Sequence, residues 1–249
     1  MENGGIEIVE TQPIQHVKHC LIGLPDVGLV GLITVNHVVQ AQGMEEVGYL
    51  ESSLLPPVIV IHQGRPKAPI RIFNKGDMAV ITSEIPIPTS AIPSLSTSII
   101  DWAKEKDVEL LINISGIAVP NRLEIKVPEV YGVASNEPSR NLLSKVDVKL
   151  LEEGFMVGPQ AMILKEAVKK DLNTIVVMAQ SHYQYPDPGA AAATVNVLNK
   201  LAGLNVDVKK LLEQAEEIRL KMRELMQRTY RSMQKMQKAQ EQELPPMYV

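Results

Sequence analysis

The amino-acid sequence predicts an α/β fold, in which a mostly parallel or mixed sheet is flanked by helices and followed by a long C-terminal helical extension. Within the first 203 residues, short β-branched runs alternate with amphipathic stretches, and a polar loop follows each expected strand. Several of these runs are continuously apolar, which is typical of strands covered on both faces. From residue 206 to residue 243 there is no Gly or Pro, and strong helix formers predominate.

The expected strands are short apolar or β-branched runs bounded by Gly, Pro and polar residues. The runs 17–22, 108–115 and 174–179 are the most apolar, and we expect them at the centre of the sheet. Two further runs, 123–127 and 130–133, are interpreted as an excursion from the sheet. The remaining expected strands are 47–51, 58–62, 70–73 and 78–82.

Two of the expected helices begin at residues that favour a helix start. Asp26 is interpreted as the N-cap of a helix over 27–42. The motif Pro186-Asp187-Pro188-Gly189 predicts another start, with Asp187 as N-cap and Pro188 at the first helical position, where its missing N–H costs nothing. The other expected helices cover 92–106, 141–153 and 159–170.

The C-terminal segment differs from the rest of the chain in pattern and in charge. Its apolar residues from Leu211 to Met236 recur mostly at spacings of three and four, which is the seam of a coiled coil or of a long packing helix. Residues 209–238 carry a net charge of +5, against −9 for the rest. An exposed seam would be a large apolar patch on a monomer, which predicts a homo-oligomer. We divide the chain into a core domain (1–203), a helical arm (204–244) and a tail (245–249).

Composition and charge exclude several classes of protein. The chain has 249 residues, of which 45% are apolar and 22% charged, as in ordinary globular proteins. The net charge of −4 argues against a nucleic-acid partner. No window approaches the roughly 20 apolar residues of a membrane span. The single cysteine, Cys20, cannot form an intramolecular disulfide, which fits a reducing compartment. We therefore expect a cytoplasmic protein without membrane or nucleic-acid partners.

The glycine-rich loop over 23–31 joins an expected strand to an expected helix, as nucleotide-binding loops do. It matches neither the G-x-G-x-x-G fingerprint nor the phosphate loop, because Leu29 and Val30 stand where the latter needs Lys and Ser or Thr. Amides at the helix start could still hold an anion. The favoured interpretation is that Gly28 and Gly31 let the helix pack closely on the sheet.

Two later loops place polar residues where α/β sheets usually carry their sites, beyond the carboxyl ends of strands. Arg122 follows one strong strand, and His182 and Tyr183 follow another. Ordinary loop packing or an oligomer contact is favoured over a catalytic crevice. The five histidines show no metal-ligand spacing, and no nucleophile elbow is present. We therefore expect no catalytic, cofactor-binding or metal-binding residues.

The last three residues are the most specific local feature of the sequence. Met247, Tyr248 and Val249 form a hydrophobic–Tyr–any ending, which chance produces in about 1% of chains of such composition. They follow Pro245 and Pro246, which end the helix. A free carboxylate in this position can be captured by a basic pocket on a partner protein.

Five segments, in order along the chain, carry a family resemblance. They are 23–31 (GLPDVGLVG), 83–90 (SEIPIPTS), 116–122 (GIAVPNR), 158–166 (GPQAMILKE) and 186–192 (PDPGAAA). Together they closely resemble the archaeal homologues of proteasome assembly chaperones, a family that includes proteasome activators. The resemblance covers nearly the whole chain. It implies an α/β domain, a homo-oligomer such as a tetramer or pentamer, and no required nucleotide.

The resemblance also implies a docking role for the tail. In proteasome activators the C-terminal carboxylate pairs with a lysine between adjacent α-ring subunits of the core particle, and the tyrosine helps to open the gate. Here Met247 takes the hydrophobic position, Tyr248 the tyrosine position and Val249 the carboxylate position. We therefore expect a non-enzymatic protein that docks on the α-ring without nucleotide.

One alternative of a different class stays open. Some members of the family have been catalogued as ATP-grasp-like carboligases, so the chain could be such a ligase or another small-molecule enzyme. Its site would be the crevice near Gly23, Gly116 and His182. The sequence shows no Mg²⁺-binding acid cluster and no phosphate-gripping Lys loop, and the non-enzymatic hypothesis is therefore favoured.

Overall fold

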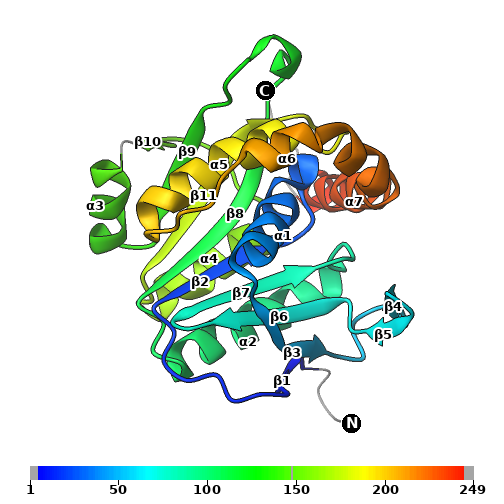
Figure 1. Ribbon diagram of the computed structural model, residues 1–249, viewed down its shortest axis with the longest axis vertical. Helices are drawn as coiled ribbons and strands as arrows, with labels where there is room; N and C mark the ends of the chain where they lie inside the picture. The colour runs from blue at the N-terminus through cyan, green and yellow to red at the C-terminus, as the bar shows by residue number, and fades with distance from the viewer. Residues whose placement is uncertain (1–4, 147, 244–249) are drawn as a thin grey trace.

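The computed structural model describes residues 5–146 and 148–243 and confirms the α/β fold (Figure 1). The strands of the main sheet are β1 (Glu7–Glu10), β2 (His19–Gly23), β3 (Glu45–Glu51), β6 (Ile70–Lys75), β7 (Met78–Ser83), β8 (Leu110–Ala118), β9 (Val130–Ala134), β10 (Lys149–Leu150) and β11 (Thr174–Ser181). They form one mixed sheet in the order β1–β3–β6–β7–β2–β8–β11–β9–β10. A separate hairpin consists of β4 (Val60–His62) and β5 (Arg65–Lys67).

Four neighbouring strands, β7, β2, β8 and β11, run parallel at the centre of the sheet. Leu21 of β2 lies opposite Val80 of β7 on one side and Ile112 of β8 on the other, and all three are fully buried. The three predicted central strands are confirmed, since such continuous apolar runs need cover on both faces. Because these strands are parallel, the loops after β2, β8 and β11 meet at one edge of the sheet.

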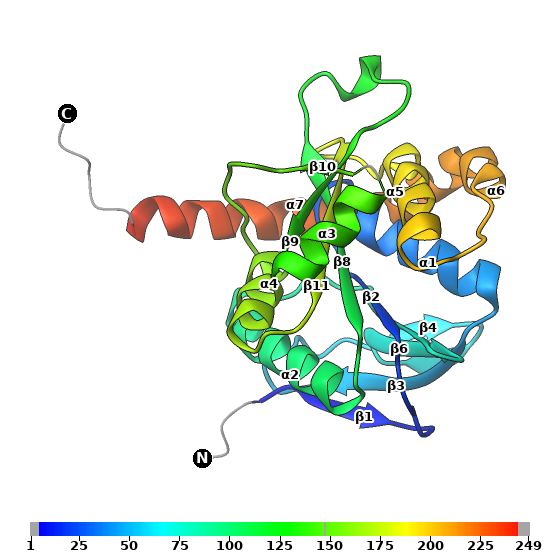
Figure 2. The ribbon, with the colours of Figure 1, turned by 90° about the vertical axis from the view of Figure 1, so that its left-hand side faces the viewer.

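Helices cover both faces of the sheet (Figure 2). They are α1 (Val30–Gln42), α2 (Ile92–Glu105), α3 (Glu137–Lys145), α4 (Pro159–Lys169) and α5 (Pro188–Leu201). On one face α1 packs against α5, and on the other α2 packs against α4. Two separate apolar clusters result, one containing Leu95 and Ile163 and the other containing Val38 and Leu198.

The predicted excursion from the sheet is only half right. The run 123–127 lies outside the sheet, in a loop that begins with a short 3₁₀ helix, η3 (Arg122–Glu124). The run 130–133, in contrast, belongs to β9 and pairs antiparallel with β11. A short strand has the same sequence pattern whether it pairs within the main sheet or lies outside it, because the pattern does not specify the strand with which it pairs. The short strands β1 and β5 were not predicted.

The helix predicted over 141–153 is α3, and its bounds were wrong. Asn136 caps the helix, since its side-chain oxygen accepts a hydrogen bond from the N–H of Ser139 at 3.1 Å. Pro138 lies in the first turn, where backbone N–H groups have no intrahelical partner, so the missing N–H of proline costs nothing. The start signal therefore precedes the predicted start, and the chain leaves the helix early enough to form β10 beside β9.

The C-terminal segment forms two helices, α6 (Lys209–Glu213) and α7 (Ala215–Glu243), separated at Gln214. Their apolar seam packs on α1 and α5, where Leu211 (2% exposed) and Met226 (0% exposed) share one cluster with Ile33. The domain of the same chain therefore covers the seam, and the expectation that it lies exposed on a monomer is wrong. The homo-oligomer stays a prediction, without this support. The last turns of α7 extend past the rest of the domain (Figure 2).

Candidate functional site

The loop after β2 approaches its neighbours too closely for side chains at two positions. A Cβ atom on Gly31 would lie 2.5 Å from the carbonyl oxygen of Ile114 on β8. Gly28 has a φ of +63°, and a Cβ atom there would lie 1.9 Å from the Ser181 Oγ. These contacts confirm that both glycines let the loop and α1 pack closely on the sheet.

Asp26 was predicted to cap the helix that follows, and this prediction is wrong. A short 3₁₀ helix, η1 (Val27–Leu29), precedes α1, and both Gly28 and Leu29 have positive φ. The Asp26 side chain makes no capping hydrogen bond to η1. The carboxyl group instead accepts hydrogen bonds from β8 and from Gln160 of α4.

The Asp26 carboxyl group is buried among uncharged hydrogen-bond donors. Its Oδ2 accepts hydrogen bonds from the Ser115 Oγ (2.5 Å), the Gly116 N–H (3.3 Å) and the Gln160 Nε2 (3.2 Å). Its Oδ1 has no hydrogen-bond partner among the described residues. Burial raises the pKa of Asp26 from 3.8 to about 8, although the Ser115 hydroxyl and the N–H groups of Gly116 and Gly31 act in the opposite direction. The carboxyl group is therefore mostly protonated at neutral pH.

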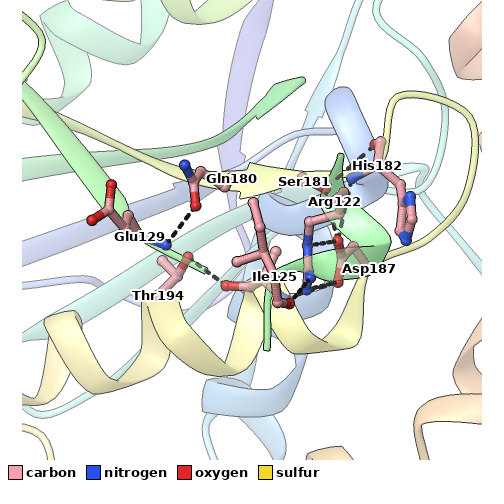
Figure 3. A network of polar contacts seen from close by, with 9 residues as sticks. Arg122, Ile125, Glu129, Gln180, Ser181, His182, Asp187 and Thr194 are labelled. Atoms are coloured by element: carbon pink, nitrogen blue, oxygen red, sulfur yellow. Dashed lines mark hydrogen bonds and ion pairs between the residues drawn. The ribbon is translucent and has the colours of Figure 1, made fainter. Parts of the chain in front are cut away.

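Arg122 and Asp187 form a buried ion pair that joins the loop after β8 to the start of α5 (Figure 3). The Arg122 Nε donates to Oδ2 of Asp187 at 2.7 Å, and Nη2 donates to Oδ1 at 2.9 Å. Asp187 also accepts from the Ala190 N–H at 3.0 Å, which confirms it as the N-cap of α5. A third Arg122 nitrogen donates to the Ile125 carbonyl at 2.7 Å. Arg122 therefore holds two loops together, which agrees with the favoured interpretation of ordinary loop packing.

The other two predicted crevice residues, His182 and Tyr183, lie at the surface of the same edge. The His182 N–H donates to Asp187 at 3.2 Å. Burial lowers the pKa of the His182 ring, Asp187 opposes this, and the charges of Arg122 and Arg219 lower the pKa further. The Tyr183 ring meets Tyr230 of α7 edge to face, with centroids 5.1 Å apart. The loop after β11 therefore anchors α7.

A cavity of about 190 Å³ lies beside Asp26 at this edge. The polar side chains in its lining are Asp26, Ser115, Gln160 and Tyr183, and the lining also includes apolar side chains from β8, β11, α7 and the loop before α4. The apolar contributors are chiefly Ile117, Phe155, Met156, Met178, Met233 and Met236.

Among the described residues, no group of three His, Cys, Asp or Glu is placed to hold a metal. The Cys20 thiol is fully buried, and burial raises its pKa to about 12, so it is not a reactive thiolate. The enzyme alternative at the crevice near Gly23, Gly116 and His182 gains no support from this geometry. In the described part of the chain, no helix has the length and apolarity needed to cross a membrane.

Four of the five segments that carry the family resemblance meet at this edge. They contribute Asp26, Arg122, Gln160 and Asp187 to the two networks described above. Spacing along the sequence did not reveal these partners, because each pair joins loops that are 65 or more residues apart. The predicted docking residues Met247, Tyr248 and Val249 lie outside the described residues.

Comparison with known proteins agrees with the resemblance. The model of the PAC2 family matches residues 20–226. The crystal structure of Pyrococcus furiosus PbaA, an archaeal homologue of proteasome-assembly chaperone, is similar with a TM-score of 0.85 and 30% identity, over 92% of this chain and 99% of that one. Pyrococcus furiosus PbaB, an archaeal proteasome activator, shares the fold with a TM-score of 0.74 and 20% identity, over 90% of this chain and 99% of that one. An uncharacterized protein of Methanocaldococcus jannaschii, MJ0106, is 27% identical over 98% of both chains.

Proposed function

The chain belongs to the PAC2 family, and from that membership we propose that it is a non-enzymatic partner of the proteasome, an assembly chaperone homologue or activator. The observation that carries the proposal is the likeness to PbaA, an archaeal homologue of proteasome-assembly chaperone, over nearly the whole of both chains. We propose that the protein acts in the cytoplasm, on the α-ring of the core particle, and without nucleotide.

The proposed contact is made by the last three residues. The Val249 carboxylate would pair with a lysine between α-ring subunits, and Tyr248 would contact the gate, with Met247 as the apolar neighbour. A charge-assisted hydrogen bond of this kind contributes about 1.5–3 kcal/mol. One tail alone would therefore bind weakly. A homo-oligomer, such as a tetramer or pentamer, would present several tails to repeated pockets and gain roughly 10²–10⁴ in avidity.

Helix α7 supports this proposal because it precedes the tail in the chain and packs on the domain. Met236 of α7 packs against the apolar core of the domain. From there the helix continues to Glu243, a rise of about 10 Å. The residues after Glu243 can span at most about 20 Å. The Val249 carboxylate can thus act up to about 30 Å from Met236, which would let it enter a pocket while the domain stays outside.

The test is peptide hydrolysis by an archaeal proteasome core particle, measured with the full chain and with a chain that lacks residues 247–249. We expect the deletion to abolish stimulation and binding, while circular dichroism and the size in solution stay unchanged, because Pro245 and Pro246 separate these residues from the helix in the sequence. Equal stimulation by the two chains would show that the tail is not the docking element.

Two point variants test which side chains of the tail are needed, since both keep the full length of the chain. Tyr248→Ala removes the hydroxyl and the ring, and we expect it to reduce stimulation strongly. Met247→Leu keeps an apolar side chain of similar volume, and we expect it to retain most of the activity. A loss of activity by Met247→Leu as large as that of Tyr248→Ala would contradict the assigned roles.

A further inference from the structure

The cavity beside Asp26 has the features of a ligand site that the proposed function does not use. We propose that it binds a small aliphatic primary amine of about six non-hydrogen atoms, as the ammonium ion, with the Asp26 carboxylate as its partner. This inference is independent of proteasome binding. It stands on the position of the cavity, on the buried carboxyl group and on the apolar lining.

The position of the cavity is the usual one for ligands in α/β sheets. It lies beyond the carboxyl ends of β2 and β8, two parallel neighbours whose following segments leave in different directions. The loop after β2 leads to α1 on one face, whereas the loop after β8 leads past β11 to β9. Such a divergence opens a crevice between adjacent strands.

The polar end of the cavity has hydrogen-bonding capacity left over. Asp26 is only 6% exposed, yet its Oδ1 has no hydrogen-bond partner among the described residues. A buried carboxyl group without a cation is costly, and an apolar side chain at this position would avoid that cost. A ligand that brings both N–H donors and a positive charge would satisfy the oxygen and stabilise the ionised form.

The rest of the cavity lining is chiefly apolar and adaptable. Four methionines line it, and Phe155 stands at its rim fully exposed to solvent. Thioether side chains adjust to ligands of varied shape, and an alkyl chain would be the natural occupant of such a lining. A volume of about 190 Å³ accommodates about six water-sized groups, which corresponds to a five-carbon chain with one nitrogen. The methionines are Met156, Met178, Met233 and Met236.

Charge selects the amine over other small ligands. The groups that hydrogen-bond to Asp26 come from β8 and α4. The N–H of Gly31 on α1 also favours the ionised form, and all of these groups are uncharged. Tyr183 is the other titratable side chain among the described residues that line the cavity. Once Asp26 is ionised, a carboxylate ligand would meet like charge and compete for the same donors, and an alcohol would bring no charge to pair with Asp26.

The test is calorimetric titration of the full chain with n-pentylamine, alongside n-pentanol and pentanoate, at about pH 9, where Asp26 is ionised and the amine is still protonated. We expect the amine to bind at least about tenfold more tightly than the alcohol, and pentanoate to show no binding. Across shorter amines, affinity should rise about fourfold per methylene until the cavity is full. Because the carboxyl group must lose its proton to pair with the ammonium, affinity should also rise about tenfold from pH 6 to pH 7.

Variants assign the binding to this cavity. Asp26→Asn keeps the shape of the side chain and should weaken pentylamine binding at least about tenfold, whereas Asp101→Asn, an exposed carboxylate on α2, should leave it unchanged. Ile117→Phe adds volume on the same face of β8 as Ser115 and should exclude the longer amines. Equal affinities for amine and alcohol, no binding of the amine, or unchanged binding in both cavity variants would overturn the proposal.

A lysine side chain of a partner protein carries the same chemical group. Nα-acetyl-lysine methylamide, a lysine flanked by two peptide bonds, distinguishes this source from a free amine. Met233 and Met236 of α7 line the cavity and leave less room for two flanking peptide bonds, so we expect the lysine derivative to bind more weakly than pentylamine. Tighter binding of the derivative would support the ammonium site and assign it to a protein lysine.

Discussion

Replacing Asp26 by Asn should change how the stability of the protein depends on pH, because the folded state holds this carboxyl group in its neutral form. Burial raises the pKa of Asp26 from 3.8 to about 8. At pH 7 the unfolded chain has released this proton and the folded chain retains it, which lowers the free energy of unfolding by about 4 kcal/mol. Between the two pKa values the unfolded state binds fewer protons, so this group reduces stability by up to about 1.4 kcal/mol per pH unit as pH rises.

The amide of the Asp26→Asn variant does not titrate and therefore avoids this loss. Its NH₂ group, however, carries two N–H donors where the neutral acid carries one O–H, and the groups around it are chiefly donors. We expect the additional unsatisfied donor to cost about 1–3 kcal/mol at every pH. We therefore expect the variant to be less stable than the wild type near pH 4 by about that amount. Near pH 7 it should be more stable by about 1–3 kcal/mol, so the sign of the difference reverses in between.

Urea denaturation of both chains across this pH range measures the difference, and groups shared by the two chains cancel. The matched control is Asp101→Asn, which removes a carboxylate from an exposed ion pair with Lys170. Its effect should stay below about 1 kcal/mol and should not reverse sign. A difference between Asp26→Asn and the wild type that does not change with pH would refute the assignment of Asp26 as a buried neutral acid.

Three further substitutions test the packing of the same edge. Arg122→Ala leaves a buried carboxylate without its cation and should lower the free energy of unfolding by about 3–5 kcal/mol; a loss under about 1 kcal/mol in urea denaturation would contradict this. Met226→Ala removes a fully buried side chain by which α7 packs on the domain, and it should lower the free energy of unfolding by about 2–5 kcal/mol. Limited proteolysis of α7 should then become faster, and an unchanged cleavage rate would mean that Met226 does not hold α7 on the domain. Gly28→Ala should lower the free energy of unfolding by about 1–3 kcal/mol in urea denaturation. The loss should exceed that of Gly43→Ala, because Gly43 has a similar φ of +59° but nothing lies within 4 Å of its Cβ position.

Prediction from the sequence was most successful for elements whose residue pattern is compatible with only one arrangement. Continuous apolar runs such as 17–22 and 174–179 need cover on both faces, so their central place in the sheet could be predicted without a structure. The same holds for the start of α5, where Asp187 and the following proline fix the cap through local geometry. In both cases the residues that decide the outcome are neighbours in the sequence.

Asp26 shows why the candidate site could not be predicted in the same way. An Asp just before an apolar, helix-like stretch is a standard cap signal. Here two left-handed residues separate it from α1, and its carboxyl group accepts hydrogen bonds from Ser115 and Gln160, which are 89 and 134 residues away. No local rule identifies partners at that distance, and the identity of Asp26 as a buried acid depends on those partners.

The seam of α6 and α7 was misread for a related reason. Its spacing shows that one face of the helix is buried, and this is correct for Leu211 and Met226. The same spacing does not show which surface covers that face, because a second copy of the chain and the chain's own domain give identical patterns. The close approach of α1 and α5 creates the apolar surface that receives the seam, and that surface exists only after the sheet has formed. Any self-association of this protein must therefore use side chains other than those that hold α7 on the domain.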